Sequence, residues 1–122
     1  MDEFYTVPFE QRCSDVNKLM AKYPDTVPSI ICRYTVEIND IDKKKYILPN
    51  ELTVRQLIKK IKDRSNTDEH TAIYLIAETI GVNKNKCHTL LSATQTMKDI
   101  YTTCVASDGF LYILYNKEQT FG

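Results

Sequence analysis

The stretch Phe110-Leu111-Tyr112-Ile113-Leu114-Tyr115 decides the fold of this chain. A run of this length made only of apolar and aromatic residues crosses a small sheet and predicts a central strand buried on both faces. After this strand the chain turns polar and ends in Phe121-Gly122. A buried strand that passes into a polar tail ending in glycine suggests a domain that acts through its own carboxyl end.

Length and composition predict one globular domain with a core of its own, because 122 residues are enough for folding without disulfide or metal cross-links. Sixteen basic residues balance sixteen acidic ones, which argues against nucleic acid as a partner and leaves only local charged patches to matter. We expect no secretory signal, because the first residues are acidic, and no membrane span, because no apolar run approaches the roughly 20 residues required. Membrane attachment would then have to be covalent.

Cysteine and histidine are too scattered to predict a metal site or a disulfide framework. The chain has four cysteines and two histidines: Cys13, Cys32, Cys87, Cys104, His70 and His88. We expect reduced thiols, as in a cytosolic protein. The adjacent Cys87 and His88 leave a small thiol hydrolase as a remote alternative.

The first half of the chain predicts a helix followed by a hairpin. Residues Pro8 to Tyr23 have apolar side chains at helical spacing, with Leu19 off the main stripe. Ser29 to Ile38 is rich in β-branched and aromatic residues and predicts a strand, and Asp42 to Pro49 predicts its partner, entered through three lysines. Asp2 to Thr6 is expected to be an arm or a short helix.

The second half predicts the remaining elements of a β-grasp fold, in which a mixed sheet wraps one main helix. Thr53 and Gln56 form a capping box, so Thr53 to Arg64 is expected to be a helix. Ala72 to Ala77 predicts a strand, Gly81 to Ser92 a long polar loop, and Met97 to Cys104 a short helix. The fold class is therefore α+β, a ubiquitin-like β-grasp with an N-terminal helical extension; the expected boundaries are 1–28 for the extension and 29–122 for the β-grasp and tail.

Several short motifs, in order along nearly the whole chain, resemble the autophagy-related ubiquitin-like modifiers, the family of autophagy-related protein eight and the GABA-receptor-associated protein. The motifs are Pro8-Phe9-Glu10-x-Arg12, Tyr23-Pro24-Asp25-x-Val27-Pro28, Asp42-Lys43-Lys44-Lys45-Tyr46 with Pro49, Leu52-Thr53-Val54, Gly109-Phe110-Leu111-Tyr112 and Phe121-Gly122. The chain departs from the family pattern at Thr26, Arg55 and Leu57, and in a longer segment around Gly81 to His88. These departures leave the preferred binding motifs open.

The resemblance implies that the protein is not an enzyme and has no cofactor, and that other proteins act on its carboxyl end. Activating and conjugating enzymes would join Gly122 to phosphatidylethanolamine, a processing cysteine protease would reverse the bond, and both would recognise Phe121. A glycine suits this chemistry because a residue without Cβ threads narrow active sites. The expected localisation is cytoplasmic, and the autophagosome membrane after lipidation.

The resemblance also implies binding of cargo receptors through aromatic-x-x-aliphatic motifs, which add as a strand to an exposed sheet edge. The aromatic pocket would be lined by Asp15, Leu19, Pro28, Ile30, Lys45, Ile47 and Phe110. The aliphatic pocket would be lined by Tyr46, Leu48, Pro49, Leu52, Leu57 and Ile61. Acidic residues flanking the motif would meet Lys43, Lys44 and Arg64. The alternatives are a β-grasp interaction or trafficking protein that is never conjugated, and a modifier joined to a protein.

Overall fold

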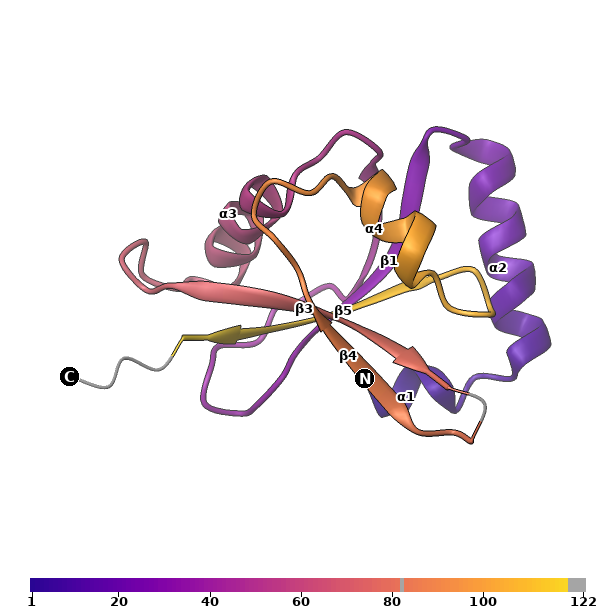
Figure 1. The fold of residues 1–122 in the computed structure, drawn as a ribbon, viewed down its shortest axis with the longest axis horizontal. Coiled ribbons are helices and arrows are strands. Elements are labelled where there is room, and N and C mark those ends of the chain that lie inside the picture. Colours follow the sequence, from indigo (N-terminus) through magenta and orange to yellow (C-terminus); the bar gives the residue numbers. More distant parts are fainter. Residues whose placement is uncertain (82, 119–122) are drawn as a thin grey trace.

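The computed structural model describes residues 1–81 and 83–118, and it has the predicted α+β architecture (Figure 1). Helices and strands follow one another in the order α1 (Asp2–Tyr5), α2 (Phe9–Lys22), β1 (Thr26–Arg33), β2 (Lys45–Pro49), α3 (Val54–Ser65), β3 (Ile73–Ile80), β4 (Lys86–Leu90), α4 (Met97–Cys104) and β5 (Leu111–Lys117). Gly122 and Phe121 lie outside the described residues.

Strand β5 forms the centre of a five-stranded sheet with the order β2-β1-β5-β3-β4. It runs parallel to β1, with Ile31 opposite Ile113, and antiparallel to β3, with Ala77 opposite Ile113. The last strand of the chain therefore joins the β2-β1 half of the sheet to the β3-β4 half. The sequence prediction of a central closing strand beside the first strand is confirmed.

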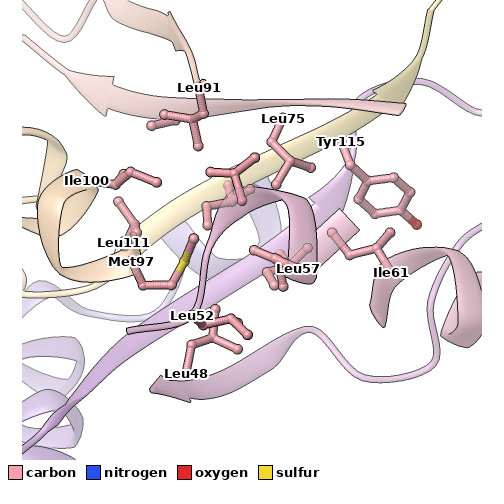
Figure 2. Close-up of a cluster of buried hydrophobic side chains, with 14 of the residues drawn as sticks. Leu48, Leu52, Leu57, Ile61, Leu75, Leu91, Met97, Ile100, Leu111 and Tyr115 are labelled. Atoms are coloured by element: carbon pink, nitrogen blue, oxygen red, sulfur yellow. The ribbon is translucent and has the colours of Figure 1, made fainter. Parts of the chain in front are cut away.

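Two hydrophobic clusters fill the two faces of the sheet. On one face, α3 and α4 pack on the sheet, and Figure 2 shows the side chains of Leu57, Met97 and Leu111 converging there. On the other face, Val16 of α2 packs over Tyr112 and Leu114, and α1 covers the remainder. The side chains of β5 alternate between these clusters, which is why its sequence shows no polar face.

Capping boxes start helices α3 and α4. The Thr53 hydroxyl accepts from the Gln56 amide at 3.2 Å and the Gln56 side chain accepts from the Thr53 amide at 2.9 Å, which completes the capping box of α3. A second capping box, between Thr96 and Asp99, starts α4. Helix α2 begins after Pro8 and ends before Tyr23.

The prediction of a strand from Ser29 to Ile38 is wrong at both ends. Strand β1 begins at Thr26 and ends at Arg33, so it includes Pro28. The amide of Ile31 donates to Lys44 on the β2 side, and alternation therefore turns the nitrogen of Pro28 away from β2. The register of β1 with β5 starts only at Ser29, so the missing N–H of Pro28 removes no bond from the ladder.

The prediction of a long loop from Gly81 to Ser92 is also wrong, because Lys86–Leu90 forms β4 and pairs with β3. All five residues of β4 are exposed. A strand without a buried face has no alternation of apolar and polar residues, and the segment therefore lacks the signal by which strands are recognised.

Candidate functional site

The site residues predicted from the sequence gather around β2, which is one edge of the sheet. Strand β2 pairs with β1 on one side, and in the described part of the chain no strand lies on its other side. Because Ile31 N donates to Lys44 O, the backbone groups of Lys44, Tyr46 and Leu48 point toward β1. The N–H and C=O groups of Lys45 and Ile47 consequently face outward, where an added strand would pair with them.

The predicted aromatic pocket lies between α2 and β2 and is nearly closed. Asp15, Ile30, Lys45 and Phe110 line a hollow of about 30 Å³, which has room for no more than a water molecule or two. The Lys45 ammonium lies beside it, since Nζ is 4.0 Å from Asp15 Oδ2 and 5.7 Å from the centroid of the Phe110 ring. Phe4, Val7, Arg12 and Tyr112 complete the lining, so an aromatic side chain can enter this hollow only after side chains around it move.

Three other residues were predicted for the same pocket. Leu19 and Ile47 line an adjoining, more open hollow of about 360 Å³, together with Lys43, Lys45 and Tyr46. Pro28 is buried in β1 directly opposite Ile47 and lines neither hollow.

The second predicted pocket lies between β2 and α3, and half of the predicted residues line it. Tyr46, Leu57 and Ile61 border a hollow of about 260 Å³. Leu48 and Leu52 are instead buried in the core, and Pro49 is exposed at the end of β2. The rest of the lining comes from Ile31, Lys60, Asp63 and Arg64.

Sequence reasoning missed Lys60 in this second pocket. Its position three residues after Leu57 and four before Arg64 places it on the same side of α3 as both, and this spacing was the signal available. The pocket therefore has an apolar floor and a charged rim.

Tyr46 separates the two pockets. Lys43 Nζ lies 5.2 Å and Arg64 Cζ 5.7 Å from the centroid of the Tyr46 ring, so this one ring makes cation–π contacts with two basic side chains. The Tyr46 hydroxyl is buried and has no hydrogen-bond partner among the described residues. Burial raises the pKa of this hydroxyl, which stays protonated.

Only part of the predicted basic rim is available to a ligand. Arg64 is half exposed and lies 3.8 Å from Asp42. Lys44 instead turns toward the preceding loop, where it donates to the carboxylate of Asp40 and to the backbone of Ile41. Partial burial raises the pKa of Asp40, but the hydrogen bonds from Lys44 and from the Ile41 amide outweigh it and lower the pKa overall.

A buried polar cluster fixes the position of α2 and of Phe110. The carboxylate of Asp108 accepts from Arg12 at 2.8 Å, from the Phe110 amide at 2.8 Å and from the Tyr112 hydroxyl. Only 1% of the Asp108 side chain is exposed, so these bonds replace its hydration. Burial, and then the hydrogen bond to Asp108, raise the pKa of Tyr112.

The Cys87-His88 pair cannot act as a thiol–imidazole couple. Neighbouring residues of a strand project to opposite faces. His88 Nε2 lies 2.9 Å from the buried carboxylate of Glu78, which also accepts from Tyr5 at 2.8 Å. His88 is thus engaged by Glu78, and the strand geometry gives no support to a thiol–imidazole site at this pair.

Two further features bear on the site. Within residues 1–81 and 83–118, no group of three or more His, Cys, Asp or Glu side chains could hold a metal ion. Over the same residues, no helix has the length and apolar character to cross a membrane.

A mixed sheet that wraps one main helix, with parallel first and last strands and a helical extension before it, defines a ubiquitin-like β-grasp protein. The family described as "Autophagy protein Atg8 ubiquitin like" matches residues 11–122. The chain belongs to this Atg8 family.

Similar proteins come from three different organisms. Autophagy-related protein 8 of Emericella nidulans is 37% identical over 94% of this chain and 91% of its own length. Autophagy-related protein 8h of Arabidopsis thaliana is 32% identical over 93% of this chain and 88% of its own. The crystal structure of Trypanosoma brucei ATG8 matches with a TM-score of 0.76 and 33% identity, over 94% of this chain and 92% of that one.

Proposed function

We propose that this protein is an autophagy modifier that is joined through Gly122 to phosphatidylethanolamine and binds aromatic-x-x-aliphatic motifs along β2. Membership of the Atg8 family supports the first half. The observation that carries the second half is the free edge of β2, with outward backbone groups between two hollows lined by many of the predicted residues.

In the conjugation reaction, the chain is the acyl donor and other proteins supply the catalysis. An activating enzyme joins the Gly122 carboxylate to the AMP part of ATP with release of pyrophosphate. A cysteine thiolate then displaces AMP to give a thioester, and the lipid amine displaces the thiolate to give an amide. A cysteine protease that recognises Phe121 would hydrolyse that amide. The protein would be cytoplasmic before conjugation and bound to the autophagosome membrane afterwards.

In motif binding, the peptide adds to β2 as a further strand. Its backbone pairs with Lys45 and Ile47, the aromatic anchor displaces the Lys45 ammonium from Phe110, and the aliphatic anchor enters the hollow beside Leu57 and Ile61. Lys43, Lys45 and Arg64 then lie near acidic residues that precede the aromatic anchor. The displaced Lys45 ammonium then pairs with one of these peptide carboxylates instead of with Asp15.

Reconstitution with the activating and conjugating enzymes, ATP and vesicles containing phosphatidylethanolamine tests the first half of the proposal. We expect a lipid-linked product from the wild type and none from Gly122→Ala. Transfer only to a protein acceptor would favour the alternative modifier. No transfer at all would leave a β-grasp binding protein that is never conjugated.

A further inference from the structure

Strand β4 forms the second edge of the sheet, on the opposite side from β2. It pairs with β3 from Ile76–Leu90 to Ile80–Lys86, and the described residues include no strand on its outer side. All five of its residues are exposed. The sheet thus has a second edge whose backbone groups are open to solvent.

The hydrogen-bond pattern fixes which groups of β4 point outward. Leu91 N donates to Leu75 O at 3.0 Å, and Gly81 N donates to Asn85 O at 2.8 Å, so odd-numbered residues of this segment point their backbone groups at β3. Alternation along an antiparallel strand then turns the N–H and C=O groups of Lys86, His88 and Leu90 outward. These three residues could form the hydrogen bonds of an added strand without losing any to β3.

The side chains of the same three residues share one face of the sheet and differ along it. Leu90 is 69% exposed and lies at one end. Lys86 lies at the other end, four residues away, with Ile80, 46% exposed, directly across from it on β3. His88, in the middle, is held by the buried carboxylate of Glu78. The edge therefore offers an apolar contact and an ammonium at a fixed separation.

We propose that the outer edge of β4 binds an extended acidic segment of another protein as an additional antiparallel strand. An aliphatic side chain of that segment packs against Leu90, and a carboxylate four residues later lies across from Lys86. Lys86 already donates to Asp2 at 2.6 Å, but an ammonium has three donors and can serve a second carboxylate. The anchoring of His88 by Glu78 and the β3 ladder orders this edge before binding.

Charge distinguishes this partner from a second copy of the chain. If two β4 strands paired antiparallel with His88 opposite His88, Lys86 of each copy would lie opposite Leu90 of the other. If they paired with Cys87 opposite Cys87, Lys86 of each copy would lie opposite His88 of the other. Neither register places a carboxylate opposite Lys86, and lysine on an edge strand is a known device against self-pairing. A strand with an aliphatic residue four positions before a carboxylate matches both Leu90 and Lys86.

The site lies at the opposite edge of the sheet from β2, so it can be tested while β2 is blocked. The probe is a seven-residue peptide in which leucine precedes glutamate by four positions, with threonine and valine between them. It is titrated into the full chain at saturating concentration of an aromatic-x-x-aliphatic peptide, and amide shifts are followed by NMR. We expect shifts at Lys86, His88 and Leu90.

Charge exchange gives the decisive control. We expect Lys86→Glu to weaken peptide binding about two- to fivefold, because one exposed ion pair is lost and replaced by a repulsion, and we expect a peptide with lysine in place of glutamate to recover binding to this variant. Lys98→Glu, an exposed charge reversal on α4, should leave the affinity unchanged. Leu90→Pro, which deletes an outward N–H and no β3 bond, should also abolish binding. Absence of shifts along β4, shifts confined to β2, or dimerisation through β4 would overturn the proposal.

Discussion

At the scale of single residues, Asp108 shows how one buried carboxylate organises a binding surface. It joins α2 to β5 through Arg12 and fixes the amide of Phe110, whose ring forms the base of the closed hollow. In the sequence Asp108 is followed directly by Gly109, and nothing in its spacing indicates burial. A partner 96 positions away in the chain cannot be predicted from local pattern.

The ion pair between Arg12 and Asp108 makes a prediction about stability. Arg12→Gln should lower the free energy of unfolding by about 3 kcal/mol, because it leaves a buried carboxylate without its counterion. Urea denaturation followed by circular dichroism measures this change. Lys18→Gln, an exposed change on the same helix, is the matched control and should be nearly neutral. Equal stability of the two variants would contradict the importance assigned to the buried pair.

At the scale of elements, the helices were predictable and one strand was not. Capping and apolar periodicity are local properties, so α2, α3 and α4 were predicted close to their bounds. Strand β4 has neither a buried face nor a β-branched run, and it exists because the second half of β3 provides a partner. Its formation is a tertiary effect that a local pattern does not record.

The cap of α3 makes a prediction at this scale. Thr53→Ala should destabilise the protein by about 1 kcal/mol, because it removes the acceptor for the Gln56 amide. Thermal or urea unfolding measures the loss. Glu51→Ala, an exposed change two residues earlier, should have little effect. Equal unfolding midpoints for the two variants would show that the cap does not stabilise the protein.

The β2 edge makes a prediction about recognition. Lys45→Glu combined with Arg64→Glu should weaken a motif peptide with an acidic flank by about three- to thirtyfold, from two exposed pairs of roughly 0.2 to 1 kcal/mol each plus repulsion after reversal. Calorimetric titration measures the affinity, and added salt should narrow the difference. The double reversal Lys22→Glu and Lys98→Glu keeps the same net charge and serves as control. Equal affinities for the two double variants would remove the basic rim from the proposal.

At the scale of the whole molecule, the central position of β5 joins the fold to its function. The strand orders both hydrophobic clusters, positions Phe110 beside the β2 edge and delivers the segment that leads to Gly122. The sequence predicted this role because burial on both faces leaves an unmistakable apolar run. The pocket linings were less predictable, because Leu48 and Leu52 are buried in the hydrophobic core and are not available to line a pocket.

The most direct test of the central claim is transfer of the C-terminal glycine to lipid. Purified protein is incubated with activating and conjugating enzymes, ATP and vesicles with or without phosphatidylethanolamine, and mass spectrometry measures the product. We predict an increase equal to one phosphatidylethanolamine less one water for the wild type, and unchanged mass for Gly122→Ala. Equal lipid attachment to both proteins, or attachment at any residue other than Gly122, would contradict the account.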